Sequence, residues 1–214
     1  MTDFQPIRLI PPAADAAIDA AARAEDAARA DLYGLLATLF YRAPDAVLLH
    51  HIAANRAHGD DAGTALGDAW NGLCDAASGT AAADAAGEYQ ALFGRDGAAA
   101  APVPLQGGGY ARGCALPALR GDLARYGLVR RAGVGESEDH LGTLCEVMRV
   151  LMAGEQAGAG GPAEQRRFFA RHLLPWADDF GGTLAAHPRA CFYARVARLF
   201  AAFVAVEASA LGLA

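Results

Sequence analysis

The sequence predicts an all-α protein that folds as a single helical bundle. Hydrophobic residues make up 54% of the 214 residues, and many of them are alanine, which favours helix over strand. Apolar residues recur at helical spacing along most of the chain, and no segment shows the two-residue alternation of a strand. We expect one helical domain over residues 15–214, preceded by a flexible lead-in over residues 1–14 that contains Pro6, Pro11 and Pro12.

The clearest predicted helix covers residues 136–152. Its apolar residues form one stripe with the spacing of a core-facing helix, namely Leu141, Leu144, Cys145, Met148, Leu151 and Met152. Ser137 is the predicted N-cap, which places Glu138 and Asp139 in the first turn and His140 at the third helical position. We expect Asp139 and His140 to be exposed at this helix N-terminus.

The remaining helices follow from the same spacing and from glycine and proline breaks. We predict them at about 15–43, 45–57, 62–77, 80–93 and 111–126, with a last helix that begins near Pro188. Gly127 fits a left-handed C-cap, and 154–162 is a glycine-rich linker. Pro175 either kinks a helix or lies in the first turn of one that restarts after Leu174. The irregular segment 94–109 is long enough to be functional, so we place it near the site.

Composition and charge narrow the class of protein. A net charge of -6 and a pI near 5.4 argue against a nucleic-acid surface and suit a basic partner. The four cysteines form no CxxC pair, which predicts buried free thiols in a reducing compartment. The N-terminus lacks the pattern of a signal peptide, and the longest apolar run, 199–206, is far shorter than the about 20 residues of a membrane span. We expect a cytoplasmic protein without stable membrane insertion.

Enzyme signatures are absent from the sequence. There is no nucleophile elbow, zinc-binding His-Glu-x-x-His helix or phosphate loop, and no histidine has a glutamate three residues before it. One alternative stays open, a helical-bundle metal protein or enzyme that uses Asp139 and His140. A ligand-binding regulator is a weaker alternative, because no basic recognition helix for DNA is present. Local hydrogen bonding also explains His140, and core packing also explains Tyr89, Leu92 and Phe93.

Several short motifs occur in a fixed order along the chain. They are Glu88-Tyr89-x-x-Leu92-Phe93-Gly94, then Pro104 to Tyr110, then Glu138-Asp139-His140-Leu141, followed by 168–176 and Phe192-Tyr193. In this order they resemble the TorD/DmsD family of cytoplasmic molybdoenzyme maturation chaperones, over about residues 28–207. The formate dehydrogenase branch is the most similar, on the run from Glu138 to Met148 and on His172 to Ala177.

The resemblance implies a non-enzymatic chaperone with a TorD-like helical bundle. Such a protein binds the twin-arginine signal peptide or the immature apo-form of a molybdopterin oxidoreductase until the cofactor is inserted. By position, peptide recognition falls on Tyr89, Leu92 and Phe93, on the segment Pro104, Leu105, Gln106 to Tyr110, and on Asp139 and His140. The loop departs from the family pattern, which is commonly a Pro-Pro-aromatic-acid-Ser-Val-Tyr run, because the segment from Pro104 to Tyr110 reads Pro-Leu-Gln-Gly-Gly-Gly-Tyr and lacks the aromatic residue and the serine. The family has also been linked to guanine nucleotide, but no nucleotide motif is present.

The physical chemistry of the client peptide agrees with this assignment. A twin-arginine signal peptide joins two arginines to an apolar stretch, so its receptor needs an apolar groove and nearby carboxylates. Leu92 and Phe93 are candidates for the groove, and the candidate carboxylates are Glu88, Glu136, Glu138 and Asp139. Members of the resembled family exchange helices between protomers, so we expect a monomer or a helix-swapped homo-oligomer, with 154–161 as the hinge.

Overall fold

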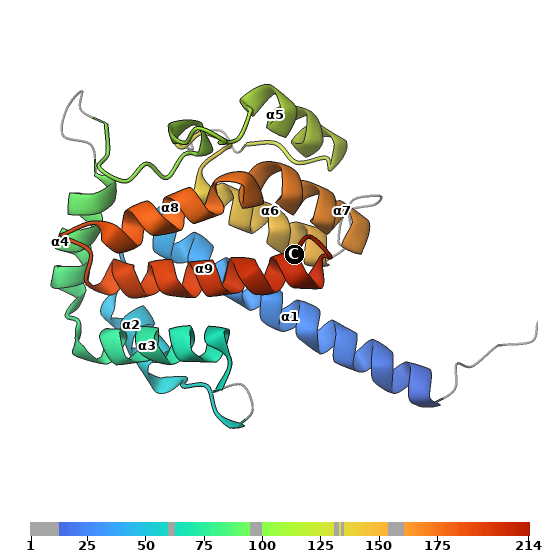
Figure 1. Ribbon diagram of the computed structural model, residues 1–214, viewed down its shortest axis with the longest axis horizontal. Helices are drawn as coiled ribbons and strands as arrows, with labels where there is room; N and C mark the ends of the chain where they lie inside the picture. The colour runs from blue at the N-terminus through green and yellow to red at the C-terminus, as the bar shows by residue number, and fades with distance from the viewer. Residues whose placement is uncertain (1–12, 60–62, 95–99, 131–132, 134, 154–160) are drawn as a thin grey trace, which may run out of the picture.

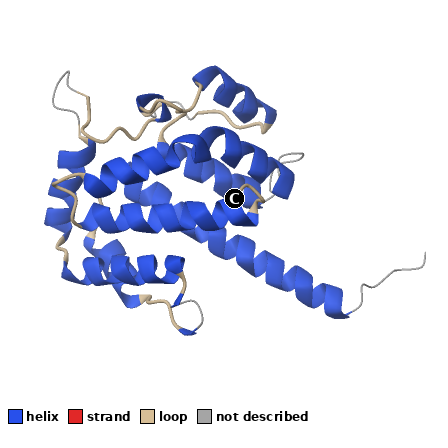
Figure 2. Cartoon of the chain, viewed as in Figure 1, coloured by secondary structure: helices blue, strands red, loops and turns tan. Residues whose placement is uncertain are grey.

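The computed structural model describes residues 13–59, 63–94, 100–130, 133, 135–153 and 161–214, and it confirms the all-α prediction (Figure 1). The described residues contain helices and loops but no strand (Figure 2). The helices are α1 (Ala13–Tyr41), α2 (Ala46–Ala54), α3 (Ala65–Gly79), α4 (Ala82–Phe93), α5 (Leu116–Arg125), α6 (Leu141–Ala153), α7 (Pro162–Phe168), α8 (Leu174–Ala186) and α9 (Phe192–Ala210). A short 3-10 turn, η2 (Gly107–Gly109), and a π turn, η3 (Phe169–Leu173), complete the elements.

Helix α9 lies between α8 and α3, while α1 packs along α6. An aromatic cluster joins these helices, because the ring centroid of Phe40 in α1 lies 5.3 Å from that of Phe180 in α8 and 6.0 Å from that of Phe200 in α9. Edge-to-face ring packing of this kind is favourable beyond the area it buries. The first half of α1 projects from the body, and α5 covers the opposite side of the bundle (Figure 1).

The predicted apolar stripes form the core. In α6 the residues Leu141, Leu144, Cys145, Met148 and Leu151 are buried, as the spacing predicted. Side-chain N-caps begin α2 and α3. Asp45 accepts from the backbone N–H of Leu48, and Thr64 accepts from that of Gly67. Among the described helices, none combines the length and the hydrophobicity that a membrane span requires.

A buried ion pair joins α1 and α9, and no pattern in the sequence predicts it. Glu207 is fully buried and accepts hydrogen bonds from the guanidinium of Arg29 and, at 2.9 Å, from the hydroxyl of Tyr33. Gln165 accepts a further bond from Arg29 at 3.3 Å. The carboxylate is therefore satisfied inside the protein, as a buried charge must be.

Of the two outcomes predicted for Pro175, a kink or a first-turn position in a restarted helix, the structure shows the second. It lies in the first turn of α8, which begins at Leu174 directly after the π turn. The Leu174 N–H donates to the Phe169 carbonyl across the π turn, and the indole N–H of Trp176 donates to the His172 carbonyl at 2.8 Å. The widened turn lets the chain continue without the N–H that proline lacks.

Several predicted boundaries were inexact, and some fall outside the described residues. Helix α5 begins at Leu116 rather than near 111, because a turn closed by the 2.9 Å bond from Gly113 N–H to the Tyr110 carbonyl precedes it. Gly127 has the expected left-handed conformation, with φ of 70°. The predicted lead-in lies outside the described residues except for 13–14, which are helical, and the hinge 154–161 lies outside them except for Gly161.

Candidate functional site

The loop around residues 104–110 is tied directly to the start of α6. The Gly107 N–H donates to the Asp139 carbonyl at 3.0 Å, and the Leu141 N–H donates to the Leu105 carbonyl at 2.8 Å. These bonds form an isolated antiparallel bridge between Gln106 and His140. Two of the predicted recognition segments therefore form one unit.

This bridge explains why the predicted start of α6 was wrong. Helix α6 begins at Leu141 and not near Glu136, because residues 137–140 form a turn closed by the 3.1 Å bond from His140 N–H to the Ser137 carbonyl, and His140 then pairs with the loop. His140 is the residue that caps the helix: its Nδ1 accepts from the Gly142 N–H at 3.1 Å. Ser137 instead donates its hydroxyl to the Asp139 carboxylate.

Close packing in the loop requires glycine. A Cβ on Gly109 would lie 2.7 Å from the Cβ of Pro104, and one on Gly113 would lie 1.6 Å from the Gly107 carbonyl oxygen. The loop is anchored by Tyr110, whose hydroxyl donates to the Pro104 carbonyl at 2.9 Å and whose ring stacks on Trp176 at 5.3 Å. The packing around Pro104 and Gly107 therefore leaves no room for a side chain at Gly109 or Gly113.

Asp139 and His140 are not exposed, contrary to the sequence-based expectation. Each has only 3% of its surface exposed, because the loop folds over them. The Asp139 carboxylate accepts from the Gly108 N–H at 2.8 Å, and the His140 ring stacks on Tyr41 with centroids 4.9 Å apart. Burial lowers the pKa of His140 and outweighs the raising effect of the Glu136 and Asp139 carboxylates, so this histidine is neutral at neutral pH.

Most of the predicted recognition residues line one pocket of about 290 Å³, which we call the loop pocket. It brings together side chains from α4, from the loop and from the segment that precedes α6. Its lining residues are Tyr89, Phe93, Ala100, Ala101, Pro104, Leu105, Gln106, Glu136 and His140. The order of motifs in the sequence predicts these segments, and the fold places residues from each of them around the same cavity.

Other predicted residues lie elsewhere. Glu88 accepts from the first N–H groups of α9, at 2.8 Å from Cys191 N and 2.7 Å from Tyr193 N, so its carboxylate caps that helix. Leu92 is fully buried in the core. Glu138 pairs with the Arg120 guanidinium at 3.2 and 3.1 Å, and these hydrogen bonds lower the pKa of Glu138.

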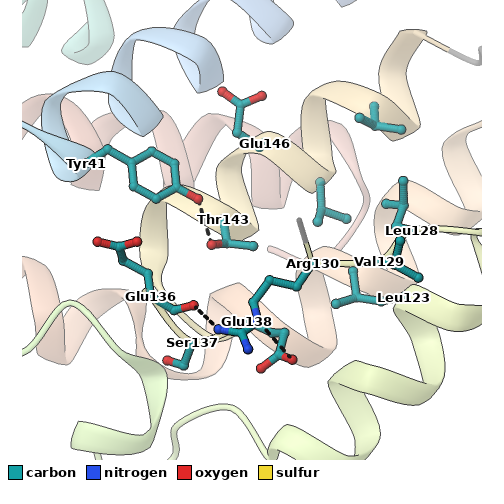
Figure 3. A pocket seen from close by; sticks show the side chains of 12 residues that line it. Tyr41, Leu123, Leu128, Val129, Arg130, Glu136, Ser137, Glu138, Thr143 and Glu146 are labelled. Atoms are coloured by element: carbon teal, nitrogen blue, oxygen red, sulfur yellow. Dashed lines mark hydrogen bonds and ion pairs between the residues drawn. The ribbon is translucent and has the colours of Figure 1, made fainter. Parts of the chain in front are cut away.

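Glu136 differs from the other predicted acids. Its side chain is exposed, and among the described residues its carboxylate takes part in no hydrogen bond or ion pair. The nearby Arg130 donates instead to the Glu136 carbonyl oxygen at 3.3 Å. Figure 3 shows the Glu136 carboxylate on the side of Tyr41, turned away from the Arg130 guanidinium.

Sequence reasoning missed a second pocket, of about 230 Å³, which we call the α6 pocket (Figure 3). Its apolar lining comes from the end of α5, the segment after it and one face of α6. The lining residues are Tyr41, Leu123, Leu128, Val129, Arg130, Glu136, Ser137, Glu138, Thr143, Glu146, Val147 and Val150. The available signal was Val147 and Val150, which lie three residues apart beside the core stripe of α6.

Asp122, His172 and Cys114 form a cluster of buried polar side chains outside both pockets. Asp122 in α5 accepts from His172 Nε2 at 2.7 Å and from Arg171 at 3.1 Å, and Cys114 Sγ lies 3.2 Å from His172 Nδ1. Burial opposes the charge on Asp122, but the His172 hydrogen bond and the neighbouring arginines prevail and lower its pKa. Burial raises the pKa of the Cys114 thiol to about 12, so this cysteine is not a reactive thiolate.

The metal-protein alternative receives no support from this geometry. The described part of the chain contains no group of three or more histidine, cysteine, aspartate or glutamate side chains placed to hold a metal ion. Asp139 and His140 each accept a bond from a different backbone N–H. Their side chains therefore serve the local fold.

Comparison with protein families gives a match over more than half of the chain. A family model described as nitrate reductase delta subunit matches residues 60–181, which is more than half of the chain. No match was found among curated proteins. The chain therefore belongs to the nitrate reductase delta subunit family, a TorD-type family of molybdoenzyme chaperones rather than enzymes.

Proposed function

We propose that this molybdoenzyme maturation chaperone binds the twin-arginine signal peptide of its client in the cytoplasm until the cofactor is inserted. Family membership supports the maturation role. The observation that carries the peptide assignment is the loop pocket, where Tyr89, Phe93, the loop, Glu136 and His140 line one cavity. These residues come from three segments that are distant in sequence.

The pocket has the chemistry that an arginine side chain requires. The Glu136 carboxylate is without a described partner, so it is available to accept two parallel hydrogen bonds from a guanidinium. Tyr89 and Phe93 supply aromatic surface on which a guanidinium stacks favourably. His140 is neutral because burial lowers its pKa, so it does not repel the arginine.

For the client, we propose the catalytic subunit of a formate dehydrogenase. The support is the resemblance of the run from Glu138 to Met148, and of His172 to Ala177, to the formate dehydrogenase branch. The description of the matched family names nitrate reductase, which makes a nitrate reductase catalytic subunit the second candidate. Both clients are molybdoenzymes, so the choice between them changes the peptide and not the chemistry of the site.

Calorimetric titration tests the proposal. The purified protein is titrated with synthetic signal peptides from a formate dehydrogenase and a nitrate reductase, each also made with both arginines replaced by glutamine. We expect the formate dehydrogenase peptide to bind more tightly, and the arginine replacement to weaken binding by about tenfold or more. A scrambled peptide of the same composition controls for net charge. Absence of binding to both native peptides would contradict the proposal.

A further inference from the structure

We infer that the α6 pocket receives the apolar stretch of the signal peptide, while Glu136, at the edge shared by the two pockets, holds the arginine next to that stretch. The inference rests on the proposed function. It assigns the arginine and the apolar stretch of the peptide to different surfaces. Of the α6 pocket lining, the sequence-based site contained only Glu136 and Glu138, and the pocket adds Val129 and Val150 as contacts of the client.

The two pockets meet at one place. Glu136 lines both of them, while Tyr41 lines the α6 pocket and His140 lines the loop pocket. The Tyr41 and His140 rings are stacked nearly parallel, at 7°, so the lining of one cavity is in contact with the lining of the other. A peptide that extends from one pocket to the other therefore passes the Glu136 carboxylate.

The pockets differ in polarity, and this difference orients the peptide. The loop pocket presents the exposed amide of Gln106 beside the Glu136 carboxylate. The α6 pocket presents valine and leucine side chains, and Val129 on its rim is 89% exposed, although burial of such a side chain is favourable. The apolar part of the peptide accordingly lies on the α6 side of Glu136, and the residues before the arginines lie on the loop side.

The carboxylates around the α6 pocket can bind one arginine of the peptide rather than two. Glu138 is paired with Arg120, and Glu146 is paired with Arg149 at 2.9 Å. Glu136 is the lining carboxylate for which the described residues provide no ion-pair partner. A basic residue immediately before an apolar stretch complements this arrangement, which is the order found in a twin-arginine peptide. The other arginine of the pair then remains in solvent.

Double-mutant cycles between protein and peptide test both contacts. The cycle for the charged contact combines Glu136→Gln with peptides in which one of the two arginines is replaced by glutamine. The cycle for the apolar contact combines Val129→Ser with a peptide in which one leucine of the apolar stretch is replaced by serine. Two matched controls change the same chemistry at exposed positions that line neither pocket: Glu25→Gln in α1 and Val47→Ser in α2.

We expect Glu136→Gln to weaken binding of the native peptide by about tenfold, and Val129→Ser to weaken it by about threefold. In Glu136→Gln, replacing the arginine next to the apolar stretch should cause no further loss, whereas replacing the other arginine should have the same small effect in both proteins. The control variants should bind as the unchanged protein does. Both tested side chains are exposed, so the variants should fold normally.

Two results would overturn the inference in distinguishable ways. If the native peptide binds and its arginine replacement weakens binding, but Glu136→Gln and Val129→Ser bind it as tightly as the controls do, the peptide occupies another surface and the proposed function stands. If the native peptides do not bind the unchanged protein, the proposed function and the inference both fail.

Discussion

Asp122 and Glu136 are both carboxylates beside arginines, yet the fold treats them in opposite ways. Asp122 is 4% exposed and accepts bonds from His172 at 2.7 Å and from Arg171 at 3.1 Å. Glu136 is exposed, and the guanidinium of its neighbour Arg130 donates to its carbonyl oxygen rather than to its carboxylate. The first carboxylate is closed within the protein, and the second is open to a partner.

The difference shows how to separate structural acids from binding acids. A carboxylate whose partners are supplied by the fold stabilises that fold, and it would have to give them up to bind a ligand. Glu88, which caps α9, and Asp139, which accepts from the Gly108 N–H, belong with Asp122 in this respect. Glu136 lacks such partners among the described residues and lines both pockets.

The largest effect should come from removing the closed carboxylate. Asp122→Ala leaves the buried His172 Nε2 and the nearby arginines without their acceptor, and we expect a loss of about 3 kcal/mol in the free energy of unfolding. Urea denaturation measures this loss. Peptide affinity of the folded variant should not change. A loss below about 1 kcal/mol would show that Asp122 is not a structural acid.

A somewhat smaller effect should follow from disturbing the loop that closes over Asp139. In Gly113→Ala the new Cβ would lie 1.6 Å from the Gly107 carbonyl oxygen, so the backbone must move, at a cost of about 2 kcal/mol. Gly121→Ala in α5 is the matched control: its Cβ meets no atom within 4 Å, and we expect a gain of about 0.5 kcal/mol. Equal melting temperatures for the two variants would contradict this account.

The sequence was sufficient to predict the helices, because their signals are local. The stripe from Leu141 to Leu151 and the restart at Pro175 depend only on spacing and on the missing proline N–H. The start of α6 was mispredicted because it depends on Leu105 and Gly107, which lie more than 30 residues earlier. Their backbones form the hydrogen bonds with Leu141 and Asp139. No local pattern encodes that pairing.

The candidate site was predictable as a set of segments but not as a set of contacts. The order of motifs suggested residues that line the loop pocket, including Tyr89 and Gln106. It could not show that Glu88 caps α9, nor that Arg130 leaves the Glu136 carboxylate open. Whether an acid is open or closed depends on partners that are distant in sequence, such as Cys191 for Glu88.

Mild acid should lower the stability of the protein through its buried histidines, His140 and His172. Burial lowers the pKa of both His140 and His172 below the ordinary 6.5, so the unfolded chain binds more protons as pH falls through that value. Stability should therefore decrease between about pH 7 and pH 5, by less than in Asp122→Ala. The lowered pKa of Asp122 adds a further loss as the pH falls toward and below the ordinary value of 3.8. Melting temperatures measured from pH 8 to pH 5 test this, and a constant or rising value on acidification would contradict it.

The smallest effect on stability should come from the open carboxylate. Glu136→Gln keeps the size of an exposed side chain that has no described partner for its charge, so we expect the free energy of unfolding to change by less than about 0.5 kcal/mol. Urea denaturation beside Asp122→Ala gives the comparison directly. A loss as large as that of Asp122→Ala would mean that Glu136 is bonded within the protein in solution. In that case the distinction between closed and open carboxylates, on which the assignment of the arginine depends, would no longer hold.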